Sequence, residues 1–227
     1  MTNTLRPSPP QMTLFYSPRA CSLACHIALE ESGLPFTAHA VRIRAGEHES
    51  ADYRRINPWG KIPALRIGDE VLTEAHAILT FIGELAPPEL ALIPTSDPLQ
   101  RARAHEWMNF LSSTVHIAFR PLFRPQSLLG AAELHPKLRE VGVPTLRKTL
   151  SEVDSRLAAK TWALGERYSV CDPYLLVFYI WSQREDVIEY APDLPNWRAL
   201  AERMFARPAT ERALAREGLT RDSLKLR

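Results

Sequence analysis

Four side chains that could hold or ionise a thiol lie close together near the start of the chain. Tyr16, Ser17, Cys21 and Ser22 fall where a short apolar run, stopped by Ser17-Pro18, gives way to a helical pattern. A helix N-terminus has unpaired N–H groups and a positive dipole end, which stabilise an anion. A free thiol has a pKa near ~8.5, and lowering it by about two units means stabilising the thiolate by roughly 2.7 kcal/mol. The junction therefore predicts a thiolate site, with Cys21, Tyr16 and Ser22 as its active groups.

The three cysteines have different predicted roles. Cys21 belongs either to this site or to the core as a small apolar filler, and its position alone does not choose between the two. Cys25 comes one position too late to complete a C-x-x-C motif with Cys21, so we expect it to pack in the core. Cys171 stands beside a capping pattern and is expected to be structural. An odd number of cysteines argues against a disulfide framework and for a reducing compartment.

The segment that positions these residues alternates strand and helix signals. In chain order the predicted elements are residues 12–16 (strand), 21–32 (helix), 36–43 (strand), 64–67 and 71–72 (strands) and 74–85 (helix). Gly33 stands where the first helix would end, and Gly68-Asp69 supplies a hairpin turn. The order is β-α-β, an irregular segment, then β-β-α.

Beyond this segment the sequence pattern becomes purely helical. Prolines between residues 87 and 98 block a continuing helix and mark a linker. Helical patterns follow at residues 99–119, 138–159, 174–184 and 197–206, with no convincing strand signal. The predicted fold class is therefore α/β plus all-α. Its parts are a tail (residues 1–11), an α/β domain (12–86), a linker (87–98) and an all-helical domain (99–227).

Composition excludes several classes of protein. The chain has 227 residues, of which 45% are hydrophobic and 24% charged, as in an ordinary globular protein. A net charge of +2 gives no reason to expect a nucleic-acid partner or an anionic membrane surface. Residues 1–11 lack the apolar core of a signal peptide, and the apolar stretch 174–181 is too short to cross a bilayer. We therefore expect no membrane partner and a cytoplasmic location.

Several strings along the chain together resemble the glutathione S-transferase family, and the bacterial beta class in particular. They are, in order, Leu14-Phe15-Tyr16-Ser17-Pro18, Ala20-Cys21-Ser22-Leu23, Asn57-Pro58-Trp59-Gly60-Lys61-Ile62-Pro63, Leu72-Thr73-Glu74-Ala75, Glu106-Trp107-Met108-Asn109-Phe110-Leu111, Val115-His116 and Ser169-Val170-Cys171-Asp172. Each string alone is weak, but their order and spacing are specific. The similarity runs from about residue 12 to about residue 219. It implies an N-terminal thioredoxin-like domain that binds glutathione.

The resemblance assigns roles in the N-terminal half. It implies that Cys21 faces the glutathione sulfur and that the Ile62-Pro63 bond is cis, with the Ile62 backbone pairing with the cysteine part of glutathione. It also implies that the N–H groups opening the helix at Glu74-Ala75 receive the γ-glutamyl carboxylate and that Glu74 accepts from the ammonium. Without the resemblance, an ordinary trans proline and a helix-favouring acidic residue would be expected.

In the helical half, the resemblance implies that His116 reaches toward the sulfur. Ser113 and Asn109, one and two turns earlier, fall on a similar helix face and are implied to bind glutathione, partly across a dimer interface. The sequence also departs from the class, because Ile117 replaces a lysine and Thr114 an acidic residue. No clear counterpart of a further lysine is found near residues 44–46. Each departure removes a charged contact to the peptide.

These observations predict an enzyme that adds the glutathione thiolate to a small hydrophobic electrophile, as a homodimer and without a metal. One alternative is a glutathione-dependent redox enzyme in which Cys21 exchanges disulfides. Another is a non-catalytic binding or scaffold protein with the same fold. Ser169 and Asp172 predict a capping box. The aromatic residues Trp107, Phe110, Phe119 and Phe123 belong either to the core or to an acceptor pocket.

Overall fold

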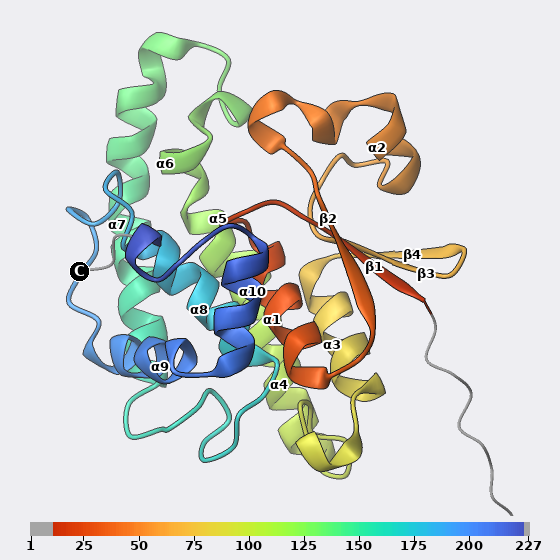
Figure 1. Cartoon of the computed structure of the whole chain (residues 1–227). Helices are drawn as coiled ribbons and strands as arrows, with labels where there is room; N and C mark the ends of the chain where they lie inside the picture. The colour runs from red at the N-terminus through yellow and green to blue at the C-terminus, as the bar shows by residue number, and fades with distance from the viewer. Residues whose placement is uncertain (1–10, 225–227) are drawn as a thin grey trace, which may run out of the picture.

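The N-terminal half is built on a mixed four-stranded sheet (Figure 1). A computed structural model describes residues 11–224, and the structural statements below refer to these residues. The strands are β1 (Met12–Tyr16), β2 (Phe36–Ala40), β3 (Ala64–Ile67) and β4 (Glu70–Thr73), in the order β2-β1-β3-β4. β1 pairs in parallel with β2 and antiparallel with β3, and β3 and β4 form the predicted hairpin around Gly68-Asp69.

Helices cover both faces of this sheet because the strand side chains alternate between two cores. Met12 and Leu14 of β1 pack in the large core with α1 (Ser22–Ser32) and α3 (Ala75–Leu85). Phe15 packs on the opposite face with Tyr53 of α2 (Ala51–Ile56) in a smaller cluster. Figure 1 shows α1 lying between the sheet and the helical half of the chain. The start of α1 is thereby placed where the two halves meet.

The second half is helical, as predicted, with no named strand among the described residues. Its elements are α4 (Pro98–Phe110), a π-helical turn η4 (Leu111–Val115), α5 (His116–Ala118), α6 (Arg120–Phe123), α7 (His135–Arg156), α8 (Cys171–Ser182), α9 (Pro195–Phe205) and α10 (Pro208–Arg216). Short 3₁₀ segments occur in both halves and between them. They are η1 (Ile43–Ala45), η2 (Glu47–Glu49), η3 (Pro88–Leu90), η5 (Pro125–Ser127), η6 (Ala132–Leu134) and η7 (Asp222–Leu224). All 12 residues of α8 are buried, so this helix is the centre of the half.

Several predicted boundaries were wrong. β2 ends at Ala40 because the chain then turns into η1, and the helix predicted over residues 99–119 is interrupted by the π-helical turn. α2 lies in the segment predicted as irregular, where Ser50 caps it by accepting from the Tyr53 N–H. α10 was not predicted. The domain boundaries at residues 86 and 98 stay a prediction, and residues 1–10 of the predicted tail lie outside the described residues.

The capping pattern before α8 is present with one change of partner. Asp172 reaches back as predicted, accepting from the Ser169 N–H at 2.7 Å, and it also accepts from the Ala163 N–H at 2.8 Å. The Ser169 hydroxyl accepts a hydrogen bond from the N–H of Cys171, whereas the predicted donor was the N–H of Asp172. The carboxylate therefore joins the start of α8 to the preceding loop. No described helix is long and apolar enough to cross a membrane.

A buried polar contact ties the end of the chain to α1. The His26 Nδ1 and Glu217 Oε1 atoms lie 3.0 Å apart, and both side chains are fully buried. The second oxygen of Glu217 accepts from the Arg19 N–H at 3.3 Å. Around it, Arg207 and Arg212 of the α9–α10 region pair with Glu31 and Glu30 of α1. We call the His26, Glu217 and Arg19 set the C-terminal latch.

We expect Glu217→Ala to lower the free energy of unfolding by about 3 kcal/mol, because His26 and the Arg19 N–H would lose their buried partner. Urea denaturation at pH 7 measures this loss. Glu217→Gln is the matched control, since its amide oxygen can still accept one of the two bonds, and it should lose less. A surface substitution typically changes the free energy of unfolding by no more than about 0.5 kcal/mol. A change as small as this in Glu217→Ala would contradict a stabilising role for the C-terminal latch.

Candidate active site

The turn between β1 and α1 is held by the C-terminal half. Arg19 has a positive φ of 64°, a conformation that a non-glycine residue keeps only when its surroundings impose it. Its N–H donates to Glu217, and its carbonyl accepts from the Trp181 indole N–H at 2.9 Å. Cys21 follows two residues later at the cap of α1. The position of Cys21 therefore depends on residues about 200 positions away in the sequence.

The two predicted hydroxyl donors have partners within the chain. The Tyr16 hydroxyl donates to the Arg216 carbonyl at 3.1 Å, and its ring packs on His26 at 5.2 Å between centroids. The Ser22 hydroxyl is fully buried and donates to the Ser17 carbonyl while accepting the Ser17 N–H. Both side chains stabilise the β1–α1 turn from within. Their role toward a bound thiolate stays a prediction.

Cys21 is a neutral thiol, contrary to the predicted thiolate. The pKa of the Cys21 thiol is raised to about 12, mainly by burial and in part by the Glu74 carboxylate. The N–H groups of Cys21 and Ser22 and the Arg124 cation lower it only in part. The thiol donates to the Ile62 carbonyl at 3.4 Å. Burial therefore outweighs the helix N-terminus at this position.

The segment before β3 brings a second backbone edge to Cys21. The Ile62-Pro63 bond is cis, as the resemblance implied. The neighbouring Lys61 carbonyl accepts from the Tyr53 hydroxyl at 2.7 Å and from the Asn57 amide at 2.8 Å, which fixes the loop. Cys21 and Ile62 are 41 residues apart in sequence and in hydrogen-bond contact. The predicted sulfur and backbone sites are thus adjacent.

The start of α3 supplies the third part of the site. Glu74, which precedes α3, has a positive φ of 69° and an exposed side chain, while Ala75 is buried. The Glu74 carboxylate acts on the pKa of Cys21, so the two groups lie within electrostatic range. Arg19 and Glu74 are both non-glycine residues in the left-handed region, each at a strand-to-helix junction. Such strained backbone is common at functional sites.

His116 lies in the helical half, packed on a residue that holds the β1–α1 turn. Its ring is edge-on to Trp181, with centroids 5.0 Å apart, and lies 5.7 Å from Phe178. The pKa of His116 is lowered to about 4, mainly by burial and in part by the cations Arg120, Arg124 and Lys61. Lys61 is next to Ile62 in the chain, and Arg124 also acts on the pKa of Cys21. His116 is therefore uncharged at neutral pH and has charged neighbours in common with the thiol site.

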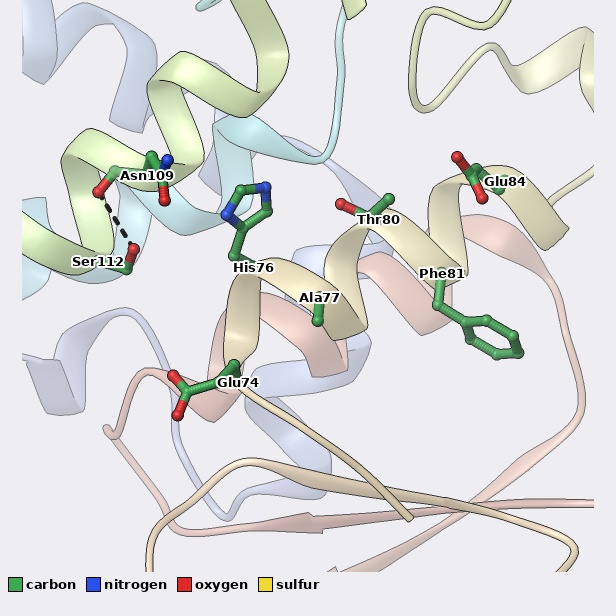
Figure 2. A pocket seen from close by; sticks show the side chains of 8 residues that line it. All are labelled: Glu74, His76, Ala77, Thr80, Phe81, Glu84, Asn109 and Ser112. Carbon is green, nitrogen blue, oxygen red and sulfur yellow. Dashed lines mark hydrogen bonds between the residues drawn. The ribbon is translucent and has the colours of Figure 1, made fainter. Parts of the chain in front are cut away.

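Asn109 and Ser113 lie in different surroundings from His116, and their predicted role in glutathione binding stays a prediction. Asn109 lines a groove of about 460 Å³ between α3 and α4, together with Glu74 and His76 (Figure 2). The Ser113 hydroxyl donates to the Asn109 carbonyl at 2.8 Å. The π-helical turn explains the difference, because its i→i+5 bonds turn each residue less than an α-helix does and shift the register before His116.

The aromatic set divides between two places. Trp107 and Phe110 pack together under the Arg156 guanidinium. Phe119 and Phe123 stack at 5.2 Å between centroids and contact Trp181, beside His116. Only the second pair adjoins the candidate site.

Sequence reasoning missed the groups that hold and polarise the site. Arg19 could not be singled out, because its role depends on Glu217 and Trp181. Lys61 and Arg124 could have been noted as cations beside the strings Ile62-Pro63 and Phe119-to-Phe123. Their convergence on His116 depends on the packing of the two halves.

The comparisons with known proteins agree with this architecture. The chain matches the family models "Glutathione S-transferase, N-terminal domain" over residues 19–85 and "Glutathione S-transferase, C-terminal domain" over residues 110–208. It is 35% identical over 210 residues to the glutathione S-transferase GstA of Escherichia coli O157:H7, which covers 92% of this chain and 100% of that protein. The chain belongs to the glutathione S-transferase family.

Solved structures of glutathione S-transferases extend the match. A bacterial beta class glutathione S-transferase from Sphingomonas chungbukensis is 36% identical, with a TM-score of 0.78 over 92% of this chain and 100% of that one. A sphingomonad glutathione S-transferase complexed with glutathione is 35% identical, with a TM-score of 0.77 over the same shares. The predicted family, its beta-class likeness and the fold are therefore confirmed. Conjugation is favoured over the redox and scaffold alternatives.

We expect Cys21 to be the first cysteine of the native glutathione S-transferase fold to react with iodoacetamide, and to react slowly at pH 7. It is 8% exposed, whereas Cys25 and Cys171 are fully buried. Because its pKa is raised to about 12, the thiolate fraction and the rate should rise about tenfold per pH unit from pH 7 to 10 without a plateau. Peptide mapping by mass spectrometry measures this, with Cys21→Ala as the control. A plateau near pH 7 would contradict the raised pKa.

Proposed function

We propose that the chain binds glutathione between its two halves and adds the glutathione thiolate to a small hydrophobic electrophile. The observation that carries this proposal is that Cys21 bonds the Ile62 carbonyl, while the neutral His116 has Lys61, next to Ile62, and Arg124, which also acts on Cys21, as charged neighbours. Cys21 and Ile62 come from the thioredoxin-like half and His116 from the helical half. Holding the thiol and the electrophile together in this way replaces a bimolecular encounter by a positioned reaction.

The neutral Cys21 thiol acts as a hydrogen-bond donor to the glutathione sulfur. It now donates to the Ile62 carbonyl, and a bound thiolate would be a stronger acceptor for the same S–H. The backbone N–H groups of Cys21 and Ser22 and the Arg124 cation favour negative charge at this point. The glutathione sulfur, not Cys21, is the nucleophile. The raised pKa of Cys21 disfavours disulfide exchange as the main activity.

His116 stays a neutral imidazole while glutathione reacts. With a pKa of about 4 it is too weak a base to hold the thiol proton, so that proton passes to solvent and a ring N–H of His116 donates to the thiolate sulfur. The sulfur then attacks the electrophile, forming the carbon–sulfur bond as the leaving group departs or the double bond accepts the electron pair. Phe119, Phe123 and Trp181 form an apolar wall for that substrate beside His116.

The peptide of glutathione lies along the N-terminal half. The Ile62 backbone pairs with its cysteine unit at Pro63, and the N–H groups at Ala75 and the carboxylate of Glu74 hold its γ-glutamyl end. Ile117 cannot supply the lysine contact of the class, and its side chain is 48% exposed. The cations Lys61, Arg120 and Arg124 around His116 supply positive charge in this region instead.

The proposed assembly is a two-fold homodimer in the cytoplasm. Asn109 and Ser113 are exposed on the helical half, so in a dimer they could serve the glutathione site of the partner. The three cysteines are free, which suits a reducing compartment. No metal is needed for this chemistry.

We expect His116→Ala to lower kcat/KM for conjugation about 10- to 100-fold, because the ring N–H that donates to the thiolate is lost. His116→Phe is the matched control: it keeps a ring against Trp181 and Phe178 but has no nitrogen, and it should fall as far. Cys21→Ala should fall less than about tenfold, since the backbone N–H groups remain.

Spectrophotometric conjugation assays between pH 5 and 9, with glutathione binding measured by calorimetry, provide the test. The acid side of the profile of kcat/KM against pH should show no inflection near pH 6.5, because His116 is already neutral there. A His116→Phe variant with parental activity would remove His116 as a donor to the thiolate. Absence of glutathione binding to the parent would instead favour the non-catalytic alternative.

Assembly has its own test. Light scattering should give about twice the 25.7 kDa mass of one chain at micromolar concentration. Asn109→Ala should then weaken glutathione binding while leaving that mass unchanged. A monomer of full conjugating activity would contradict the proposed sharing of Asn109 and Ser113 between subunits.

A further inference from the structure

The side chain of Trp181 in α8 links two parts of the candidate active site that belong to different halves of the chain. Its indole N–H donates to the Arg19 carbonyl at 2.9 Å, in the turn that carries Cys21. Its ring packs edge-on against His116, with centroids 5.0 Å apart, and against Phe123 at 5.4 Å. One side chain thus contacts both the turn beside the thiol and the aromatic wall of the helical half.

Four aromatic rings fix the orientation of this indole. Besides His116 and Phe123, the rings of Phe119 and Phe178 pack edge-on against it, with centroids 5.6 and 5.0 Å away. Trp181 is buried, whereas His116 and Phe123 are half-buried. A small apolar molecule at the wall therefore meets His116 and Phe123 first, and through these two rings it restricts the movement of the indole.

The turn that Trp181 holds is a strained element with two anchors. Arg19 has a φ of 64°, outside the range that a non-glycine residue prefers. Glu217 accepts from its N–H and Trp181 donates to its carbonyl, so the helical half binds both backbone groups of this residue. If one bond is lost, Arg19 can return to an ordinary conformation, which displaces the N–H groups of Cys21 and Ser22. The turn therefore has a held state and a released state.

We propose that Trp181 couples the binding of the two substrates, an inference that rests on the proposed function. Glutathione needs the held state, because only there do the Cys21 thiol and the start of α1 meet its sulfur. An apolar electrophile favours the same state, because it restricts the rings that orient the indole. Two ligands that stabilise one state of a shared element increase each other's affinity by the same factor. Trp181 is a positioning residue, since it acts through the Arg19 turn.

Titration calorimetry on the full chain measures this coupling. The Kd of glutathione is determined alone and with saturating meta-dinitrobenzene, an aromatic molecule with no leaving group for the thiolate to displace. We expect meta-dinitrobenzene to tighten glutathione binding about fivefold or more in the parent, the lower end of typical coupling factors. In Trp181→Phe, whose ring has no N–H to donate, the factor should be below about twofold, and glutathione alone should bind more weakly.

Trp107→Phe is the matched control. The Trp107 indole N–H also donates to a backbone carbonyl, that of Ala163 at 3.1 Å, and this tryptophan is buried to a similar degree. Its ring lies under the Arg156 guanidinium instead of beside the β1–α1 turn. The variant should keep the coupling factor of the parent. Thermal unfolding checks that both variants are folded.

Alkylation of Cys21 by iodoacetamide measures the state of the turn without glutathione. A thiol that is 8% exposed reacts mainly when the structure around it opens. We expect Trp181→Phe to raise the alkylation rate severalfold, and meta-dinitrobenzene to slow alkylation in the parent but not in this variant. A molecule that only shields Cys21 would slow the reaction equally in both proteins.

Two results would overturn the coupling. One is a glutathione affinity of the parent that meta-dinitrobenzene leaves unchanged. The other is a folded Trp181→Phe variant with the coupling factor and the Cys21 alkylation rate of the parent. Neither result affects the proposed function, which needs only glutathione binding and conjugation by the parent. A parent that binds no glutathione contradicts the proposed function, and the alkylation rates then still decide whether Trp181 holds the turn.

Discussion

The buried contact between His26 and Glu217 is the constraint on which the site depends. It joins α1 to the segment after α10, and through its second oxygen Glu217 also holds the Arg19 N–H. Arg19 is in a left-handed conformation that it would not keep alone, and Trp181 fixes its carbonyl from α8. The helical half therefore does more than provide an acceptor pocket. It holds in place the turn that carries Cys21.

Two opposing effects act on the Cys21 thiol, and their balance decides its chemistry. The start of α1 favours an anion, by an amount that is typically ~0.3–1 kcal/mol for an exposed charge. Burial acts against the anion and is the stronger effect here, because the thiol is 8% exposed and is paired with the Ile62 carbonyl. A neutral, well-placed S–H is a poor nucleophile but a good donor. The same physics therefore favours activation of a bound thiol over exchange at Cys21 itself.

The sequence was informative wherever a local pattern determines structure. The β1–α1 junction, the hairpin at Gly68-Asp69 and the start of α3 were predicted correctly, since turn residues and periodicity specify them. The hydrogen-bond partners of the Tyr16 and Ser22 hydroxyls were not predicted, because tertiary packing decides where a hydroxyl points. Arg216 lies 200 residues from Tyr16, and no local signal indicates that contact. The raised pKa of Cys21 was missed for the same reason, since it depends on how deeply the two halves bury the thiol.

The π-helical turn shows how one irregularity divides a helix between two surfaces. In an uninterrupted α-helix, Asn109 and His116 would be two turns apart on one face. The turn at Leu111–Val115 changes the register, so that Asn109 lies in the α3–α4 groove while His116 packs on Trp181 beside the thiol. Asn109, before the turn, can therefore act in that groove, while His116, after it, acts beside Trp181 and Phe178. One register shift is enough for a single helical stretch to contribute to two surfaces.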